Sequence, residues 1–264
     1  FSELMGWMVG DGCDSHARGN KHEFTQKEDR SRNHVRKLLN AVAIKNNIEL
    51  HINEYAPRET HRAHSLVFQN NKIKSLFKSH GYLWGNKSAS KEVPFSVMQA
   101  DKDGVAAFLR GYFDAEAWVD IKRQQIEISS ASELMMKQVN TLLRRFGIWM
   151  RVKKKSKCAT NGTGIYRDYW IGLIGGDSSR IYAREIGFFT DYKHDDLQKF
   201  LSVKSNTNVE GLPAYEILRE IIDTTGLPIR HVTDSYTVYL KGTQEPTRKT
   251  LQIFINNIDK ILDG

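Results

Sequence analysis

Two acidic residues, Asp11 and Glu116, end two short apolar stretches that follow the same pattern. The stretches are residues 4–12 and 109–117, and each has two small residues four positions apart before its acid. Gly6 and its counterpart Gly111 are separated by the same number of residues as Asp11 and Glu116. The small residues are Gly6 and Gly10 in the first stretch, and Gly111 and Ala115 in the second. The chain therefore contains an internal repeat.

These two acids predict a site for a divalent metal ion. Residues four apart share one face of a helix, and small residues on that face let two helices approach closely. If the two stretches pack together, Asp11 and Glu116 emerge at the same end, where both helix dipoles are negative. Two carboxylates crowded there repel each other unless a cation lies between them. The alternative, two unrelated amphipathic helices ending in acids, leaves the matching phase unexplained.

The two stretches resemble the paired LAGLIDADG motifs of homing endonucleases. The matching residues are Leu4, Gly6, Asp11 and Gly12 in the first copy, and Leu109, Gly111, Asp114, Ala115 and Glu116 in the second. Val9, Glu116 and Ala117 depart from the commonest family residues, but both acids that carry the chemistry are present. The resemblance covers about residues 1–200. It implies an α+β fold with two pseudo-symmetric αββαββα repeats, which join at a central helix pair while their antiparallel sheets form a DNA-binding saddle.

The resemblance also implies a reaction and its residues. The reaction is metal-dependent hydrolysis of one phosphodiester in each strand of a long asymmetric double-stranded DNA site, leaving short 3′ overhangs. The metal is Mg²⁺, with Ca²⁺ or Mn²⁺ as substitutes, and the implied metal-site residues are Asp11, Glu116, Gly10 and Ala115. Family members usually add a basic residue near each metal. Lys91 and Lys193 occupy matching places after Gly81 and Gly187, with solvated loop lysines as the alternative interpretation.

Composition narrows the class of protein. The chain has 39 Lys and Arg against 31 Asp and Glu, and the resulting net charge of +8 favours a polyanionic partner. Two cysteines, Cys13 and Cys158, are too few for a disulfide framework or a zinc site, which predicts an intracellular compartment. The sequence contains no run of about 18 apolar residues, so it does not predict a membrane span. The start at Phe1 suggests a chain trimmed or excised from a longer one.

After each motif, the sequence predicts the same order of elements. In the first half we expect a hairpin over 13–25, a helix over 29–43, strands over 49–55 and 61–69, and a helix from 72 to Gly81. In the second half we expect a strand-like segment over 118–129 with a turn or bulge near 122–125, and a helix opened by a Ser130–Glu133 capping box. Strands over 148–157 and 164–175 and a helix from 178 to Gly187 follow. The predicted domains are a first repeat with its linker over 1–100, a second repeat over 101–205 and a helical tail over 206–264.

One predicted strand carries a cationic face. Arg151, Lys153, Lys155 and Lys157 are two positions apart, so they lie on one side of the strand. Such a face suits the phosphates and major-groove edges of duplex DNA, and a lysine-protected edge strand is the alternative. The other predicted DNA-binding residues are Arg18, Asn20, Lys21, His51, Asn53, Arg58, Arg62, His64, Lys122, Arg123, Gln124, Gln125 and Arg167.

The tail leaves two interpretations open. Residues 238–251 resemble the end of a Cro/repressor-type helix-turn-helix, and a helical hairpin packed on the core is the alternative. For the whole chain, we predict a monomeric DNA endonuclease. The alternatives are an RNA-binding maturase with intron RNA as partner, and a non-catalytic DNA-binding regulator. The presence of both acids favours the nuclease.

Overall fold

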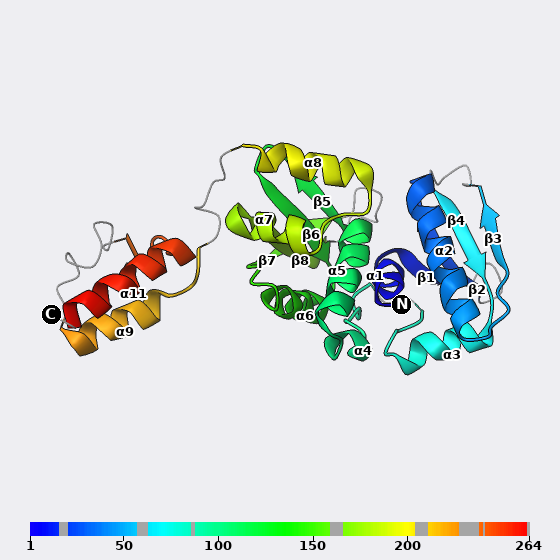
Figure 1. The fold of residues 1–264 in the computed structure, drawn as a ribbon, viewed down its shortest axis with the longest axis horizontal. Coiled ribbons are helices and arrows are strands. Elements are labelled where there is room, and N and C mark those ends of the chain that lie inside the picture. The colour runs from blue at the N-terminus through cyan, green and yellow to red at the C-terminus, as the bar shows by residue number, and fades with distance from the viewer. Residues whose placement is uncertain are drawn as a thin grey trace. The chain divides into compact units, whose positions relative to one another are not determined.

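The computed structural model describes residues 1–15, 21–56, 63–85, 88–158, 166–203, 211–226, 238–239 and 241–262 (Figure 1). The chain divides into two compact units. The first contains Phe1–Ile174 and Ser178–Lys204, and the second contains Gly175–Asp177 and Ser205–Gly264. None of the described helices is both long and apolar enough to cross a membrane.

The first unit begins with a repeat that contains one four-stranded sheet. Its elements are α1 (Ser2–Asp11), β1 (Gly12–Ser15), β2 (Lys21–Gln26), α2 (Asp29–Lys45), β3 (Ile52–Tyr55), β4 (His64–Phe68) and α3 (Asn71–Ser79). The sheet order is β1-β2-β4-β3, and every neighbouring pair is antiparallel. A short helix, α4 (Phe95–Met98), precedes the second repeat.

The second repeat follows the same order. Its elements are α5 (Lys102–Glu116), β5 (Ala117–Asp120), β6 (Gln125–Ser130), α6 (Glu133–Arg144), β7 (Arg151–Cys158), β8 (Tyr166–Gly175), α7 (Gly176–Glu185) and α8 (Asp191–Leu201). The sheet order is β5-β6-β8-β7, which is the order of the first sheet. The predicted α+β fold with two repeats is confirmed.

The helix pair α1 and α5 lies between the two repeats (Figure 1). A Cβ atom added to Gly6 would lie 2.2 Å from the carbonyl oxygen of Phe108, and one added to Gly111 would lie 2.4 Å from that of Glu3. The small residues therefore let the two backbones touch. Both helices are buried on most sides, because residues 4–9 of α1 are all buried and α5 contributes Phe108, Leu109, Tyr112 and Phe113.

The predicted start of α6 is wrong by two residues. The N-cap is Ser132, whose Oγ accepts a hydrogen bond from the backbone N–H of Met135 at 3.1 Å. Ser130 is the last residue of β6, and its Oγ accepts from the N–H of Ser132. The strand thus extends through the residue that the capping box assigned to the cap, and Glu133 is the first helical residue.

The second unit consists of two described helices with a small core. They are α9 (Tyr215–Thr225) and α11 (Arg248–Leu262). Ala214, Leu218 and Ile222 pack with Phe254, which is 2% exposed. Residues 227–237, which would complete the predicted helix-turn-helix, lie outside the described residues. The DNA-binding role of the tail therefore stays a prediction.

Candidate active site

The two acids lie at adjacent helix ends. Asp11 is the last residue of α1 and Glu116 is the last residue of α5. A Cβ atom added to Gly10 would lie 2.3 Å from Cβ of Ala115 and 3.4 Å from Cγ of Glu116, so the helices touch at this end. Burial, together with the negative charge of Glu116, raises the pKa of Asp11 to about 7. The raised pKa means that the charged form of this buried carboxylate is unfavourable here, and a bound cation would stabilise it.

Lys91 lies directly between the helix ends. Its ammonium donates to the carbonyl oxygen of Gly10 at 3.0 Å and to Oε1 of Glu116 at 2.5 Å. The side chain is only 13% exposed. Lys91 is therefore bound into the site and is not a solvated loop lysine.

Lys193 is the second lysine of the site, and it is buried. It lies in the first turn of α8 and is 5% exposed. Its ammonium donates to the carbonyl oxygen of Asp114 at 2.5 Å. Burial lowers the pKa of Lys193, while the nearby carboxylates of Asp114, Asp11 and Glu116 oppose this shift. The pKa of Lys193 therefore also depends on the charge of both candidate metal-binding acids.

Asp114 is a buried acid whose carboxylate, unlike those of Asp11 and Glu116, has backbone N–H groups as its described partners. Its carboxylate accepts hydrogen bonds from the backbone N–H groups of Phe189, at 2.7 Å, and Thr190, at 2.9 Å. Burial raises the pKa of Asp114, and these hydrogen bonds oppose the rise. Asp114 therefore holds the segment that leads into α8. The sequence pattern gave no sign of this contact.

Gln26 is a further site residue that the sequence did not reveal. It is the last residue of β2, and its Nε2 donates to Oδ2 of Asp11 at 3.0 Å. The contact joins two elements 15 residues apart, so no local spacing predicts it. In the second sheet the corresponding last residue of β6 is Ser130, whose side chain is too short for an equivalent contact.

The residues present fit a hard divalent cation. Among the described residues, no group of three or more His, Cys, Asp and Glu side chains gathers in one place. The available donors are the carboxylates of Asp11 and Glu116 and backbone carbonyl oxygens at the helix ends, such as that of Gly10. Oxygen donors of this number suit Mg²⁺, which keeps several water ligands and often uses one or two carboxylates. A closed zinc-type site does not fit.

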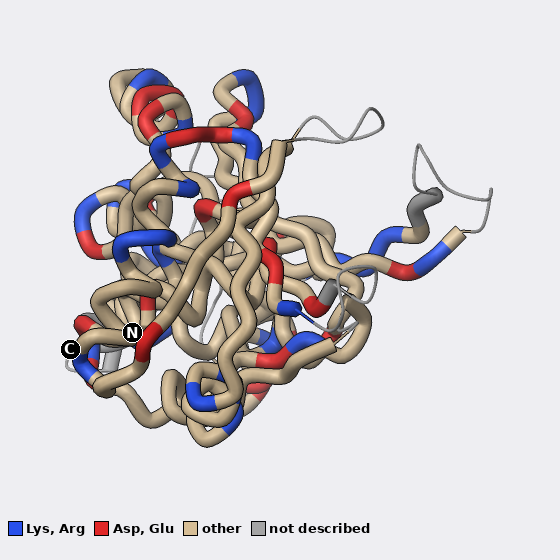
Figure 2. The backbone as a smooth tube through the Cα atoms, turned by 90° about the vertical axis from the view of Figure 1, so that its right-hand side faces the viewer, with Lys and Arg blue, Asp and Glu red and all other residues tan. Residues whose placement is uncertain are grey.

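Four cationic residues at alternate positions of β7 lie on one face of their sheet, while Lys154 lies on the other. Arg151, Lys153, Lys155 and Lys157 pair with Leu173, Ile171, Tyr169 and Arg167 of β8, respectively. The alternate pair Val152 and Gly172 faces the core, because a Cβ atom on Gly172 would meet Met150 and Ile128. Basic residues occur along much of the backbone, so this ordered row is distinguished by its alternation and not by its charge alone (Figure 2).

The other predicted DNA-binding residues do not all lie on one surface. Lys21 and Asn53 lie on the corresponding outer face of the first sheet, while His51 is exposed just before β3. Lys122 and Arg123 are exposed in the turn between β5 and β6, Gln124 is half-buried, and Gln125 is 7% exposed. His64 faces the opposite side, where Nδ1 lies 3.6 Å from Oε1 of Glu54. Arg18, Asn20, Arg58, Arg62 and the side chain of Lys157 lie outside the described residues.

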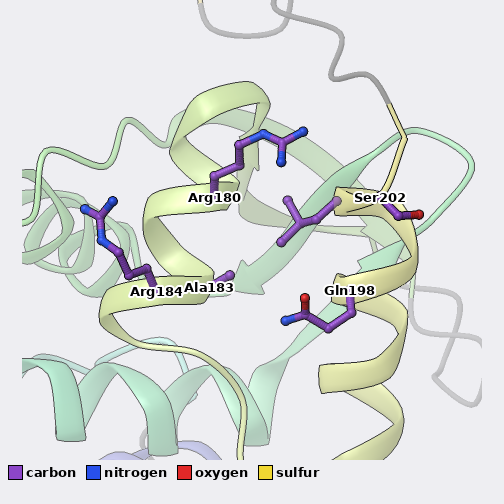
Figure 3. A pocket seen from close by; sticks show the side chains of 6 residues that line it. Arg180, Ala183, Arg184, Gln198 and Ser202 are labelled. Atoms are coloured by element: carbon purple, nitrogen blue, oxygen red, sulfur yellow. The ribbon is translucent and has the colours of Figure 1, made fainter.

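A separate cavity lies between α7 and α8 (Figure 3). Its volume is about 480 Å³, and it is lined by Arg180, Ala183, Arg184, Gln198, Leu201 and Ser202. None of the four candidate catalytic residues lines it. The acids and lysines described above are therefore not part of this cavity.

Sequence comparisons identify a known domain and several relatives. Residues 103–187 match the family model of the LAGLIDADG-like domain. The chain is 26% identical over 276 residues to a probable translation initiation factor IF-2 of Methanocaldococcus jannaschii, covering 99% of this chain and 22% of that protein. It is 24% identical over 233 residues to a glutamine–fructose-6-phosphate aminotransferase of the same organism, covering 87% and 20%. The chain thus spans about a fifth of the length of these relatives.

The structure also resembles a solved homing endonuclease. The match to I-DmoI in complex with DNA and Ca has a TM-score of 0.50 at 15% identity, and it covers 70% of this chain and 87% of that one. At this identity the match shows the fold alone. The resemblance of the paired motifs is confirmed: the chain contains a LAGLIDADG-like domain at residues 103–187, within the two-repeat fold of LAGLIDADG homing endonucleases.

Proposed function

We propose that this protein is a site-specific endonuclease that cuts both strands of duplex DNA and requires a divalent metal ion. The observation that carries the proposal is the meeting of Asp11 and Glu116 at the ends of α1 and α5, where Lys91 contacts Glu116 and the buried Lys193 contacts the backbone of Asp114. The internal repeat relates the two acids to each other, so each half of the site can cut one DNA strand. The match to a DNA-bound homing endonuclease supports this proposal.

The acids and lysines have complementary functions in the proposed reaction. Asp11 and Glu116, with the backbone at Gly10 and Ala115, would hold Mg²⁺, and Ca²⁺ or Mn²⁺ could substitute. When bound, such an ion activates water and neutralises charge on the phosphate. Lys91 and Lys193 supply positive charge beside the scissile phosphate. The lowered pKa of Lys193 brings its ammonium closer to the range in which it can transfer a proton.

The sheet faces supply the proposed DNA contacts. Lys153 and Lys155 would anchor phosphates, while the guanidinium of Arg151 can also read a base edge. Among the described strand residues, the same outer face in the first sheet carries uncharged Asn53 and a single lysine, Lys21, so the described parts of the two sheets are chemically different. This difference supports a long asymmetric target bound by one chain.

The relatives support a mobile origin for this module. Two proteins with unrelated names share a segment similar to this chain, and that segment is about a fifth of each protein. A unit inserted into different host genes would give this distribution. We therefore propose that the endonuclease acts in the spread of its own coding sequence.

The proposal is tested by incubating the protein with a randomised duplex library in Mg²⁺ and sequencing the DNA ends. We expect defined ends with short 3′ overhangs around one long asymmetric site. EDTA and the Asp11→Asn/Glu116→Gln double variant should abolish the cuts, while Asp103→Asn, which changes an exposed acid in the first turn of α5, should retain them. Selective retention of one duplex without cuts would indicate a DNA-binding regulator. Retention of structured RNA without DNA cuts would indicate a maturase.

A further inference from the structure

The two lysines of the site are carried by different kinds of segment. Lys193 lies in α8, where the helix itself supplies backbone hydrogen bonds. Lys91 lies in residues 91–94, which belong to neither a helix nor a strand. The position of Lys91 therefore depends on contacts made by its segment with other elements.

The N-cap residue of α6, Ser132, and a residue within α6, Gln138, hold the Lys91 segment from the opposite repeat. The hydroxyl of Ser132 donates to the backbone carbonyl oxygen of Lys91 at 2.5 Å. The backbone N–H of Val93 donates to Oε1 of Gln138 at 2.7 Å. Val93 is also buried in the main core at 2% exposure. The backbone is thus fixed at Lys91 itself and two residues beyond it.

The segment before Lys193 belongs to the second repeat and packs on the first. Thr190 contacts Ser31 of α2 through the two hydroxyl groups, at 3.3 Å, and the ring of Phe189 stacks on His34 of α2 at 3.9 Å. Asp114 holds the same segment from α5. Each lysine is therefore reached by a segment that packs on the other repeat, but only the Lys91 segment lacks a helix of its own at the lysine.

We propose that Ser132 and Gln138 are positioning residues for Lys91, and that through it they control cleavage of one DNA strand. The proposal rests on the proposed endonuclease function. The ammonium of Lys91 contacts Gly10 and Glu116, so a shift of its backbone would move the charge away from one half of the site. Lys193, held by α8 and Asp114, would keep its position. Loosening the Lys91 segment should therefore convert a double-strand cut into a nick.

Gln138 offers a cleaner test than Ser132. Ser132 also caps α6, so removing its hydroxyl would weaken the helix as well. Gln138→Met keeps the length of the side chain and removes the acceptor for Val93. Gln138→Glu keeps an acceptor at the same place. Lys137→Met is the matched control, because Lys137 precedes Gln138 on α6 and has a side chain that is 71% exposed and paired with Glu133.

The first measurement is single-turnover cleavage of a duplex labelled on each strand in turn, with DNA binding measured separately in Ca²⁺. For Gln138→Met we expect one strand to be cut about 10-fold to 100-fold more slowly, since small misplacements of a catalytic group have effects of that size. The other strand and the binding should change by less than about 2-fold. Gln138→Glu should restore the slow strand, and Lys137→Met should match the wild type. Equal slowing of both strands, or no slowing, would overturn the proposal.

A second measurement does not depend on cleavage. Lys91 is largely buried and hydrogen-bonded, so its reaction with acetic anhydride should be slow and should accelerate in Gln138→Met. Mass spectrometry of the peptides measures this rate, with Lys193 as an internal reference that should not change. If the wild type cuts no duplex, the endonuclease function fails, whereas the acetylation result still decides whether Gln138 positions Lys91. An unchanged rate at Lys91 would refute that positioning.

Discussion

Gly6 allows the sharpest test of how the helix pair builds the site. In Gly6→Ala, the added Cβ atom would lie 2.2 Å from the carbonyl oxygen of Phe108 and 2.7 Å from the backbone nitrogen of Tyr112. Ordinary contact at a Cβ begins at 3.4 Å. Both neighbours are backbone atoms of α5, so no side chain can rotate away. The helices must separate by about 1 Å, or α1 must shift along α5.

The expected loss of stability follows from these contacts. Overpacking in a core costs about 1–3 kcal/mol, and a clash with backbone belongs at the upper end of that range. Replacing Gly by Ala in a helix returns at most about 1 kcal/mol. The free energy of unfolding should therefore fall by about 2 kcal/mol, a large part of the stability of an ordinary domain. Cleavage should fall further, because the separation would also move Asp11 away from Glu116.

Urea unfolding followed by tryptophan fluorescence measures this effect. All five tryptophans lie at or before residue 170, so the signal reports on the first unit. Gly104→Ala is the matched control, because Gly104 is also helical and the nearest atoms to its added Cβ belong to side chains: Ala100 and Asp101, at 3.0 Å, and Ser2, at 3.5 Å. We expect Gly104→Ala to stay within about 1 kcal/mol of the wild type. A Gly6→Ala protein with an unchanged midpoint would refute close backbone contact between α1 and α5.

Three further predictions concern charge. In EDTA, Asp11→Asn should stabilise the protein by about 1–2 kcal/mol near pH 8. The pKa of Asp11 is about 7 in the folded protein against an ordinary value of 3.8, so stability falls as pH rises between these values, and partial exposure reduces the effect. Urea unfolding checks the sign, and near pH 4 the gain should vanish. Lys153→Ala should lower the salt slope of DNA binding by about 0.9, whereas Lys154→Ala, which faces the other way and pairs with Asp168, should not. Lys193→Met should slow cleavage about 100-fold with unchanged DNA affinity in Ca²⁺; wild-type cleavage would exclude it from the reaction.

The sequence predicted the features that depend on spacing within one element. Gly6, Gly10, Gly111 and Ala115 recur at four-residue intervals, and a helix converts that interval into a single face. The face then explains why α1 and α5 touch. The alternation of Arg151, Lys153 and Lys155 likewise became one face of β7, because side chains alternate along a strand.

The sequence could not predict features that depend on where separate segments cross. Asp114 lies within the second motif, yet its partners Phe189 and Thr190 are more than 70 residues away. The register of β3 and β4 places His64 and Asn53 on opposite faces of the sheet, so His64 faces Glu54. The cap of α6 was ambiguous for a local reason, since Ser130 and Ser132 are both good capping residues and only the length of β6 decides between them.

The two repeats have the same backbone arrangement, but different groups surround Asp11 and Glu116. Asp11 accepts a hydrogen bond from neutral Gln26, while Glu116 pairs with the cation of Lys91. Asp114 of the second motif holds the segment before Lys193. The first motif has the apolar Val9 at the corresponding position, and a side chain of α6 holds the Lys91 segment instead. The two halves of the site thus compensate charge by different means. Two unequal halves suit the proposed asymmetric target, because each half can be adjusted to its own DNA strand without disturbing the helix contact that both share.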